Sequence, residues 1–139
     1  MGIVHAEIVL KNLFDEEKAR EGRIKPENIR TAAVTAVVDT GSLYLVITEA
    51  LRQQLGLGIK GEKTAHIANG QRVSCIVTDA VEVRWKNRDT VVPALVIPGA
   101  EKILLGAIPL EGMDLMVNPV SQELVGVHGD EVEFLALAL

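Results

Sequence analysis

The chain has 139 residues, of which 48% are hydrophobic and 24% are charged. This composition excludes a mainly disordered chain, and the length predicts one domain over residues 1–139 with a sizeable core. The net charge is −5, and the chain has neither a basic cluster nor the aromatic side chains that nucleic-acid binding usually needs.

Charge distribution, cysteine content and hydropathy indicate in which compartment the protein is expected. Residues 1–102 carry 14 basic and 13 acidic side chains, whereas residues 103–139 carry six acids and no Lys or Arg. The single cysteine, Cys75, excludes an intrachain disulfide. No signal peptide is visible, and no apolar run approaches the roughly 20 residues of a membrane span. We therefore expect a cytoplasmic protein that binds neither a membrane nor nucleic acid.

The first third of the chain predicts two strands separated by a charged insert. Residues 3–11 alternate loosely around β-branched side chains, which favours a strand. Residues 12–30 are charged and contain no valine. They predict a short helix, a turn at Gly22 and a second short helix that begins at Pro26. Residues 31–38 form the next predicted strand, and the end of this strand looks buried on both faces.

The remaining elements are one clear helix and a series of hairpins. A helix is predicted between Thr48 and Gly56. Thr48 suits its N-cap position, and Gly56 suits the position just after its end. The turns of three hairpins are expected at Asn69-Gly70, at residues 86–89 and at residues 118–122. A short strand at residues 102–105 and a helical turn at residues 109–113 precede the third hairpin. The sequence thus predicts a mainly β (all-β) fold, a small closed barrel with one firm α-helix and a short helical insert.

The segment that carries chemistry is Val37-Val38-Asp39-Thr40-Gly41-Ser42. Its acid directly follows a predicted buried strand, so the carboxylate is partly desolvated and needs hydrogen bonds to hold its charge. Gly41 lets backbone N–H groups approach the carboxylate closely, and the Ser42 hydroxyl can donate to it. Taken alone, Asp-Thr-Gly fits equally well with an ordinary β-turn capped by an aspartate.

In its wider context this segment resembles the retropepsin-like aspartic proteases, and in particular their single-lobed bacterial members. The matching features follow one another between residues 31 and 126, and as an ordered set they are more specific than any one of them. After the Asp39 segment they are the helix over residues 48–55, a hairpin tipped by Ala68-Asn69-Gly70-Gln71, and Ile103-Leu104-Leu105-Gly106. The insert at residues 12–30 and the tail at residues 128–139 depart from the family pattern.

The resemblance implies an aspartic endopeptidase that needs no metal and no cofactor. Two carboxylates around one water must share a proton, because two like charges about 3 Å apart cannot both be ionised at little cost. The ionised carboxylate is the general base, and the protonated one hydrogen-bonds the scissile carbonyl. The chain contains only one Asp-Thr-Gly, so the second Asp39 would come from a second copy in a homodimer.

The resemblance also assigns roles to the residues of the site. Asp39 is the expected catalytic residue. The residues expected to support the active-site loop are Thr40, Gly41 and Ser42, with the Thr40 hydroxyl pointing to the partner's loop. The flap over a peptide or protein substrate would comprise Ile67, Ala68, Asn69 and Gly70. The residues expected to buttress the loop are Leu104, Leu105 and Gly106. Candidates for the walls of the substrate pockets are Val46, Ile47, Ile67, Val96 and Ile97.

Other chemistries have less support. The three histidines, His5, His66 and His128, lack metal-ligand spacing, so no metal site is expected. No Gly-x-Ser-x-Gly nucleophile segment occurs, and Cys75 sits in an apolar strand that predicts a core position. Two alternatives to a protease stay open. One is a peptide-binding module of the same fold with weak or no turnover, and the other is a barrel that binds a small molecule, with Asp39 as an ordinary turn residue. The apolar end of the tail predicts packing on the domain or on a partner chain.

Overall fold

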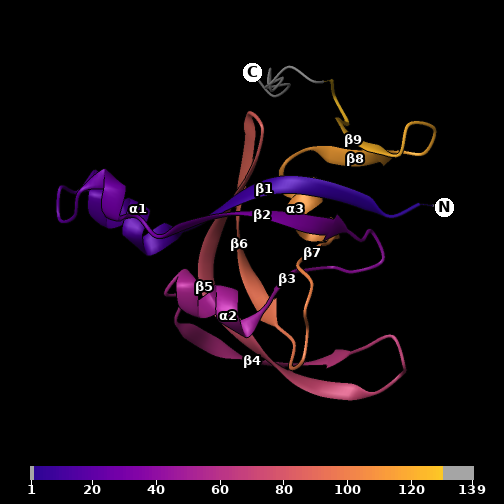
Figure 1. Cartoon of the computed structure of the whole chain (residues 1–139), viewed down its shortest axis with the longest axis horizontal. Coiled ribbons are helices and arrows are strands. Elements are labelled where there is room, and N and C mark those ends of the chain that lie inside the picture. Colours follow the sequence, from indigo (N-terminus) through magenta and orange to yellow (C-terminus); the bar gives the residue numbers. More distant parts are fainter. Residues whose placement is uncertain (1, 130–139) are drawn as a thin grey trace, which may run out of the picture.

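A computed structural model describes residues 2–129, and its main feature is a seven-stranded sheet that curls into a ring (Figure 1). The strand order is β1-β2-β7-β3-β6-β5-β4, and a further pairing of β1 with β5 closes the ring. The strands are β1 (Val4–Asn12), β2 (Thr31–Val38), β3 (Leu45–Ile47), β4 (Ile59–His66), β5 (Arg72–Trp85), β6 (Arg88–Val96) and β7 (Leu104–Leu105). The predicted small, mainly β barrel is confirmed.

An apolar cluster fills the interior of the ring. Alternate residues of β1 point inward, among them Ile8 and Leu10, which are almost completely buried. They pack with side chains from the facing strands, including Leu45, Val81 and Leu105. Because full burial of an aliphatic side chain contributes about 1.5–3 kcal/mol, this cluster is the main source of stability for the barrel.

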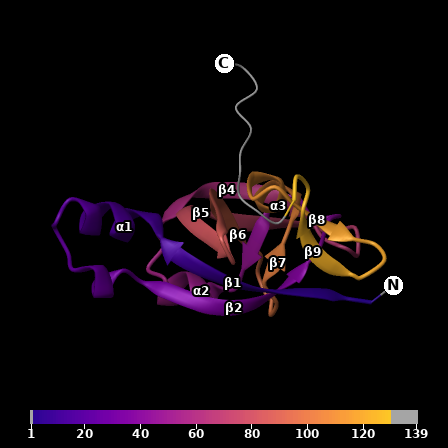
Figure 2. The same cartoon turned by 90° about the horizontal axis from the view of Figure 1, so that it is seen from above.

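The charged insert forms α1 (Leu13–Arg20) and a 3-10 turn, η1 (Pro26–Asn28), as predicted. At its base, the buried Asn12 side chain accepts a hydrogen bond from Asp15 N at 3.1 Å and donates one to Leu55 O at 2.9 Å. Asp15 also binds Arg30 through two contacts of 2.8 and 2.9 Å. The insert projects from one side of the barrel (Figures 1 and 2). These polar contacts hold its base against the barrel.

The helix α2 (Glu49–Gln54) begins after Thr48 as predicted, because the Thr48 hydroxyl accepts a hydrogen bond from Leu51 N at 3.1 Å. The first two predicted hairpins share a strand, since β5 is one continuous strand of 14 residues between their turns. A register shift between Val77 and Ala80 interrupts its pairing with β6. Such irregularities bend a strand, so the two halves of β5 can serve two hairpins.

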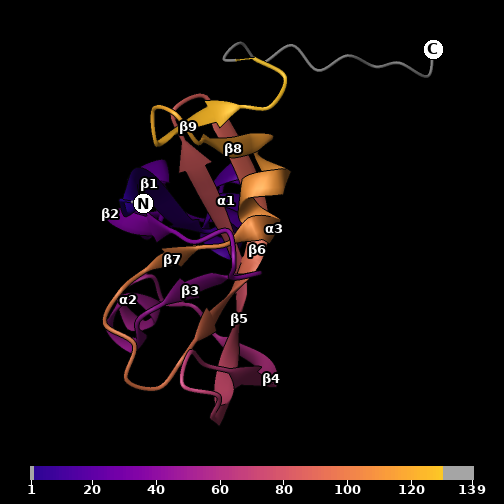
Figure 3. The same ribbon diagram turned by 90° about the vertical axis from the view of Figure 1, so that its right-hand side faces the viewer.

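The C-terminal part of the described chain comprises α3 (Ala107–Gly112) and a separate two-stranded sheet of β8 (Leu115–Asn118) and β9 (Glu123–Gly126). The buried Arg88 anchors this part by donating hydrogen bonds to the carbonyls of Met113 and Asp114. Figure 3 shows the β8–β9 sheet and the β4–β5 hairpin at opposite ends of the molecule. Of the predicted tail over residues 128–139, residues 130–139, which include its apolar end, lie outside the described residues. Within residues 2–129, no helix has the length and apolar character to cross a membrane.

Replacing Asn12 should loosen the anchor of the insert. Asn12→Ala removes the N-cap of α1 and the side-chain donor to Leu55 O, so we expect the free energy of unfolding to fall by about 2 kcal/mol. Urea unfolding measures this change. Asn28→Ala, at an exposed position of the same insert, is the control, with an expected change within about 0.5 kcal/mol. Equal losses for the two variants would contradict the anchoring role of Asn12.

Candidate active site

The Asp39 loop begins where β2 ends. Gly41 N donates a hydrogen bond to Asp39 Oδ1 at 3.0 Å, and Ser42 N donates to the Asp39 main-chain carbonyl at 3.1 Å. A tight turn thus fixes the orientation of a half-buried carboxylate. The expected hydrogen bond from the Ser42 hydroxyl to Asp39 does not occur within residues 2–129, where Ser42 joins the loop through its backbone N–H and carbonyl.

The strand β7 supports this loop on both sides. Leu105 pairs in parallel with Val38, and its carbonyl accepts a hydrogen bond from Asp39 N at 3.0 Å. At the far end of the loop, Gly106 N donates to Tyr44 O at 3.1 Å. Two further backbone hydrogen bonds join the same segments, from Ala107 N to Ser42 O at 2.8 Å and from Ile108 N to Leu43 O at 2.8 Å. Leu104, the other residue of β7, pairs with Val37.

Gly106 is required by a close approach of two backbones. A Cβ atom at this position would lie 2.5 Å from Tyr44 O and 2.7 Å from Ser42 O, closer than such atoms approach in proteins. Only glycine therefore allows the chain after β7 to lie directly against the Asp39 loop. This contact gives a physical reason for the Leu104-Leu105-Gly106 sequence.

The tip of the β4–β5 hairpin is a polar turn over residues 67–71. Gly70 has a positive φ of 83° and donates its N–H to Ile67 O at 2.9 Å, and the Asn69 side chain accepts from Gln71 N at 2.9 Å. Ala68, Asn69 and Gly70 are exposed. Figure 1 shows this tip and the loop between β2 and β3 projecting toward the same side of the view.

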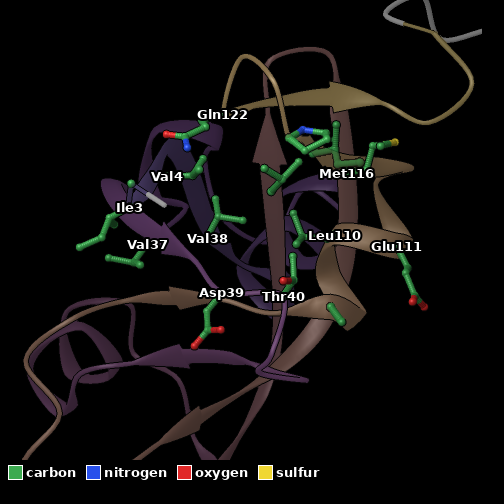
Figure 4. A pocket seen from close by; sticks show the side chains of 15 residues that line it. Ile3, Val4, Val37, Val38, Asp39, Thr40, Leu110, Glu111, Met116 and Gln122 are labelled. Carbon is green, nitrogen blue, oxygen red and sulfur yellow. The ribbon is translucent and has the colours of Figure 1, made fainter.

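A cavity of about 710 Å³ lies beside the Asp39 loop and is lined mostly by apolar side chains. They come from the N-terminal segment, the end of β2, α3 and β8, and include Ile3, Val38, Leu110 and Met116. Figure 4 shows the Asp39 carboxylate directed away from these side chains. The prediction that the end of β2 is buried on both faces is wrong for the single chain, because Val37 and Val38 are half-buried and face this cavity.

Burial or neighbouring groups displace the pKa values of several titratable side chains. Burial and the neighbouring Glu82 carboxyl raise the pKa of Glu16 to about 7, where α1 contacts β5. The hydrogen bond from His128 lowers the pKa of Asp114 in the C-terminal part. Cys75 is buried, and burial raises the pKa of its thiol. Among residues 2–129, no group of three or more His, Cys, Asp or Glu side chains could hold a metal ion.

The predicted pocket walls divide between two apolar clusters, and one contact of the site was not predicted from the sequence. Ile47 and Val96 belong to the core of the barrel, whereas Val46 belongs to a second, smaller cluster. The missed contact joins Tyr44, at the end of the Asp39 loop, to Lys63 of β4. Alternation along β4 could have indicated the face that Lys63 occupies, but not its partner.

The chain belongs to the aspartyl protease family, whose model matches residues 26–109. Among solved structures, it is similar to the protease of the retrovirus EIAV in complex with the inhibitor HBY-793. The TM-score is 0.56 and the identity 18%, and the similarity covers 79% of this chain and 86% of that one. At this identity the likeness establishes the fold alone. No curated protein matches the chain.

Adding a methyl group at Gly106 should disturb the Asp39 loop. Gly106→Ala forces the backbone of residues 42–44 to move, so we expect a loss of at least about 2 kcal/mol in the free energy of unfolding. The matched control is Gly61→Ala, because a Cβ atom at Gly61 would have no atom within 4 Å. Chemical unfolding compares the two variants. If they unfold at the same denaturant concentration, the close approach at Gly106 does not constrain the loop.

Proposed function

We propose that the protein is an aspartic endopeptidase whose active form is a homodimer, with one Asp39 carboxylate from each subunit around a shared water. The observation that carries this proposal is the intact Asp39-Thr40-Gly41 loop, which β7 holds at an accessible edge of a barrel of this family. Membership in the aspartyl protease family supports peptide hydrolysis as the reaction class.

In the proposed reaction, the two carboxylates share one proton. The ionised carboxylate takes a proton from the water as its oxygen attacks the scissile carbonyl carbon, and the protonated carboxyl hydrogen-bonds the carbonyl oxygen. The C–N bond then breaks as the amine nitrogen receives a proton from the pair. The hydrogen bond from Gly41 N to Asp39 Oδ1 holds one oxygen of each carboxylate and leaves the other for the water.

Two observations support a second copy as the source of the other carboxylate. The sequence contains one Asp-Thr-Gly, and an apolar cavity adjoins it. At this cavity Ile3 is 66% and Met116 43% exposed, an apolar surface that a second copy would cover. The same contact would bury the second face of Val37 and Val38. One association would therefore complete both the apolar packing and the catalytic pair.

The other residues of the site take supporting roles in this proposal. Thr40, which is exposed, would direct its hydroxyl to the partner's loop, and Ser42 supports the loop through its backbone. The hairpin tip of Ile67, Ala68, Asn69 and Gly70 would close over a peptide and exclude water. Leu104, Leu105 and Gly106 would keep the carboxylate in place while the hairpin moves.

Removal of the Asp39 carboxylate should abolish cleavage. Asp39→Asn keeps the shape of the side chain but cannot act as a base, so we expect cleavage of a peptide library at several pH values to fall by at least about a thousandfold. The control is Asp89→Asn, at an exposed Asp-Thr dipeptide without the glycine, and it should cleave at the wild-type rate. Unfolding curves check that both variants fold.

Two results would contradict the proposal. Cleavage that survives in Asp39→Asn would show that another group performs the chemistry. A wild-type protein that binds peptides but cleaves none between about pH 3 and pH 8 would instead support a peptide-binding module of the same fold.

A further inference from the structure

The register of β4 and β5 shows on which face of their hairpin Lys63 lies. Lys63 pairs with Cys75, and the next residue of β5 on the same face is Val77. Val77 belongs to the smaller apolar cluster, which also contains Val46 and Leu95 and packs against Tyr44 and Leu104. Glu62 pairs with Ile76, and Ile76 packs instead against the core of the barrel. Lys63 is therefore on the side of the hairpin that faces the segments next to Asp39.

A direct contact joins Lys63 to the Asp39 loop. Its ammonium nitrogen lies 3.2 Å from the Tyr44 hydroxyl and 4.9 Å from the centroid of the Tyr44 ring. The carbonyl of Tyr44 accepts the hydrogen bond from Gly106 N, so the contact is tied to the backbone that holds the loop. The hairpin of the proposed flap thus contacts, through the Lys63 side chain, the loop that carries the proposed catalytic carboxylate.

The charge of the hairpin differs from that of the whole chain. Residues 59–72 contain three basic side chains, Lys60, Lys63 and Arg72, and one acid, Glu62, which gives +2, whereas the chain carries −5. Among the ion pairs of residues 2–129 none involves Lys63. An ammonium group has three donors, and the Tyr44 hydroxyl occupies one of them. Lys63 therefore has capacity to bind a carboxylate from outside the chain.

We propose that Lys63, positioned by Tyr44, selects peptide substrates that carry an Asp or Glu side chain near the scissile bond. This inference rests on the proposed function, because it places the peptide between the hairpin and the Asp39 loop. In a symmetric dimer each subunit presents its own Lys63, so the acidic preference falls at equivalent positions on both sides of the scissile bond.

The test compares cleavage of matched peptides that place Glu, Gln or Lys at each position around one cleavage site. We expect wild type to show about a fivefold higher kcat/KM for Glu than for Gln at the selected positions, the effect of a partly exposed ion pair. Lys63→Glu should reverse the order of the Glu and Lys peptides. The preference should shrink at about 1 M salt, because salt screens such pairs.

Two variants separate selection by Lys63 from general charge and from structural effects. Arg72→Glu makes the same change of charge on the opposite face of the hairpin, and it should leave the preference unchanged. Tyr44→Phe keeps the ring but removes the hydroxyl that positions Lys63. It should weaken the Glu preference through KM, with the pH profile of kcat unaltered.

The outcomes distinguish this inference from the proposed function. Equal rates for Glu, Gln and Lys peptides in wild type and Lys63→Glu would overturn selection by Lys63, while loss of cleavage in Asp39→Asn would still support the protease. If wild type cleaves none of the peptides, their affinities for the protein, measured by fluorescence anisotropy, test the inference instead. Tighter binding of Glu peptides, reversed in Lys63→Glu, supports the inference, and equal affinities overturn it.

Discussion

The close contact between Gly106 and the backbone of residues 42–44 is the constraint on which the rest of the site depends. The strand β7 has only two residues, yet it pairs with β2 on one side and β3 on the other. The same few hydrogen bonds therefore help to close the ring and hold Asp39 at its edge. A side chain at residue 106 would separate these segments. The same substitution would therefore disturb both the closure of the barrel and the position of Asp39.

The arrangement around this contact leaves an apolar cavity beside Asp39 uncovered. The insert with α1 projects on the side away from the N-terminal segment, as Figure 2 shows, and does not cover the apolar cavity beside Asp39. In our proposal a second copy covers that cavity and supplies the other carboxylate. In the same proposal, the contact between Lys63 and Tyr44 positions a positive charge that would recognise acidic side chains of the substrate.

Local signals predicted much of this structure. Thr48 and Gly56 bracket α2 because capping chemistry depends on near neighbours in sequence, and the order of motifs predicted the family. Burial at the end of β2 could not be predicted, because apolar residues such as Val37 are equally suited to a core and to an interface. The faces of Ile47 and Val46 were also ambiguous, since both faces of β3 are apolar. The hydrogen-bond partners of the Ser42 hydroxyl and of Lys63 could not be predicted either, because they depend on how distant segments pack together.

The most direct test of a shared catalytic pair is to refold wild type mixed with Asp39→Asn in varying proportions. If one carboxylate comes from each copy, mixed dimers are inactive and peptidase activity follows the square of the wild-type fraction. An equal mixture would then keep about a quarter of the activity of the same total amount of wild type. Activity that instead falls linearly, to about half in the equal mixture, would mean that each chain carries a complete site and would contradict the central claim.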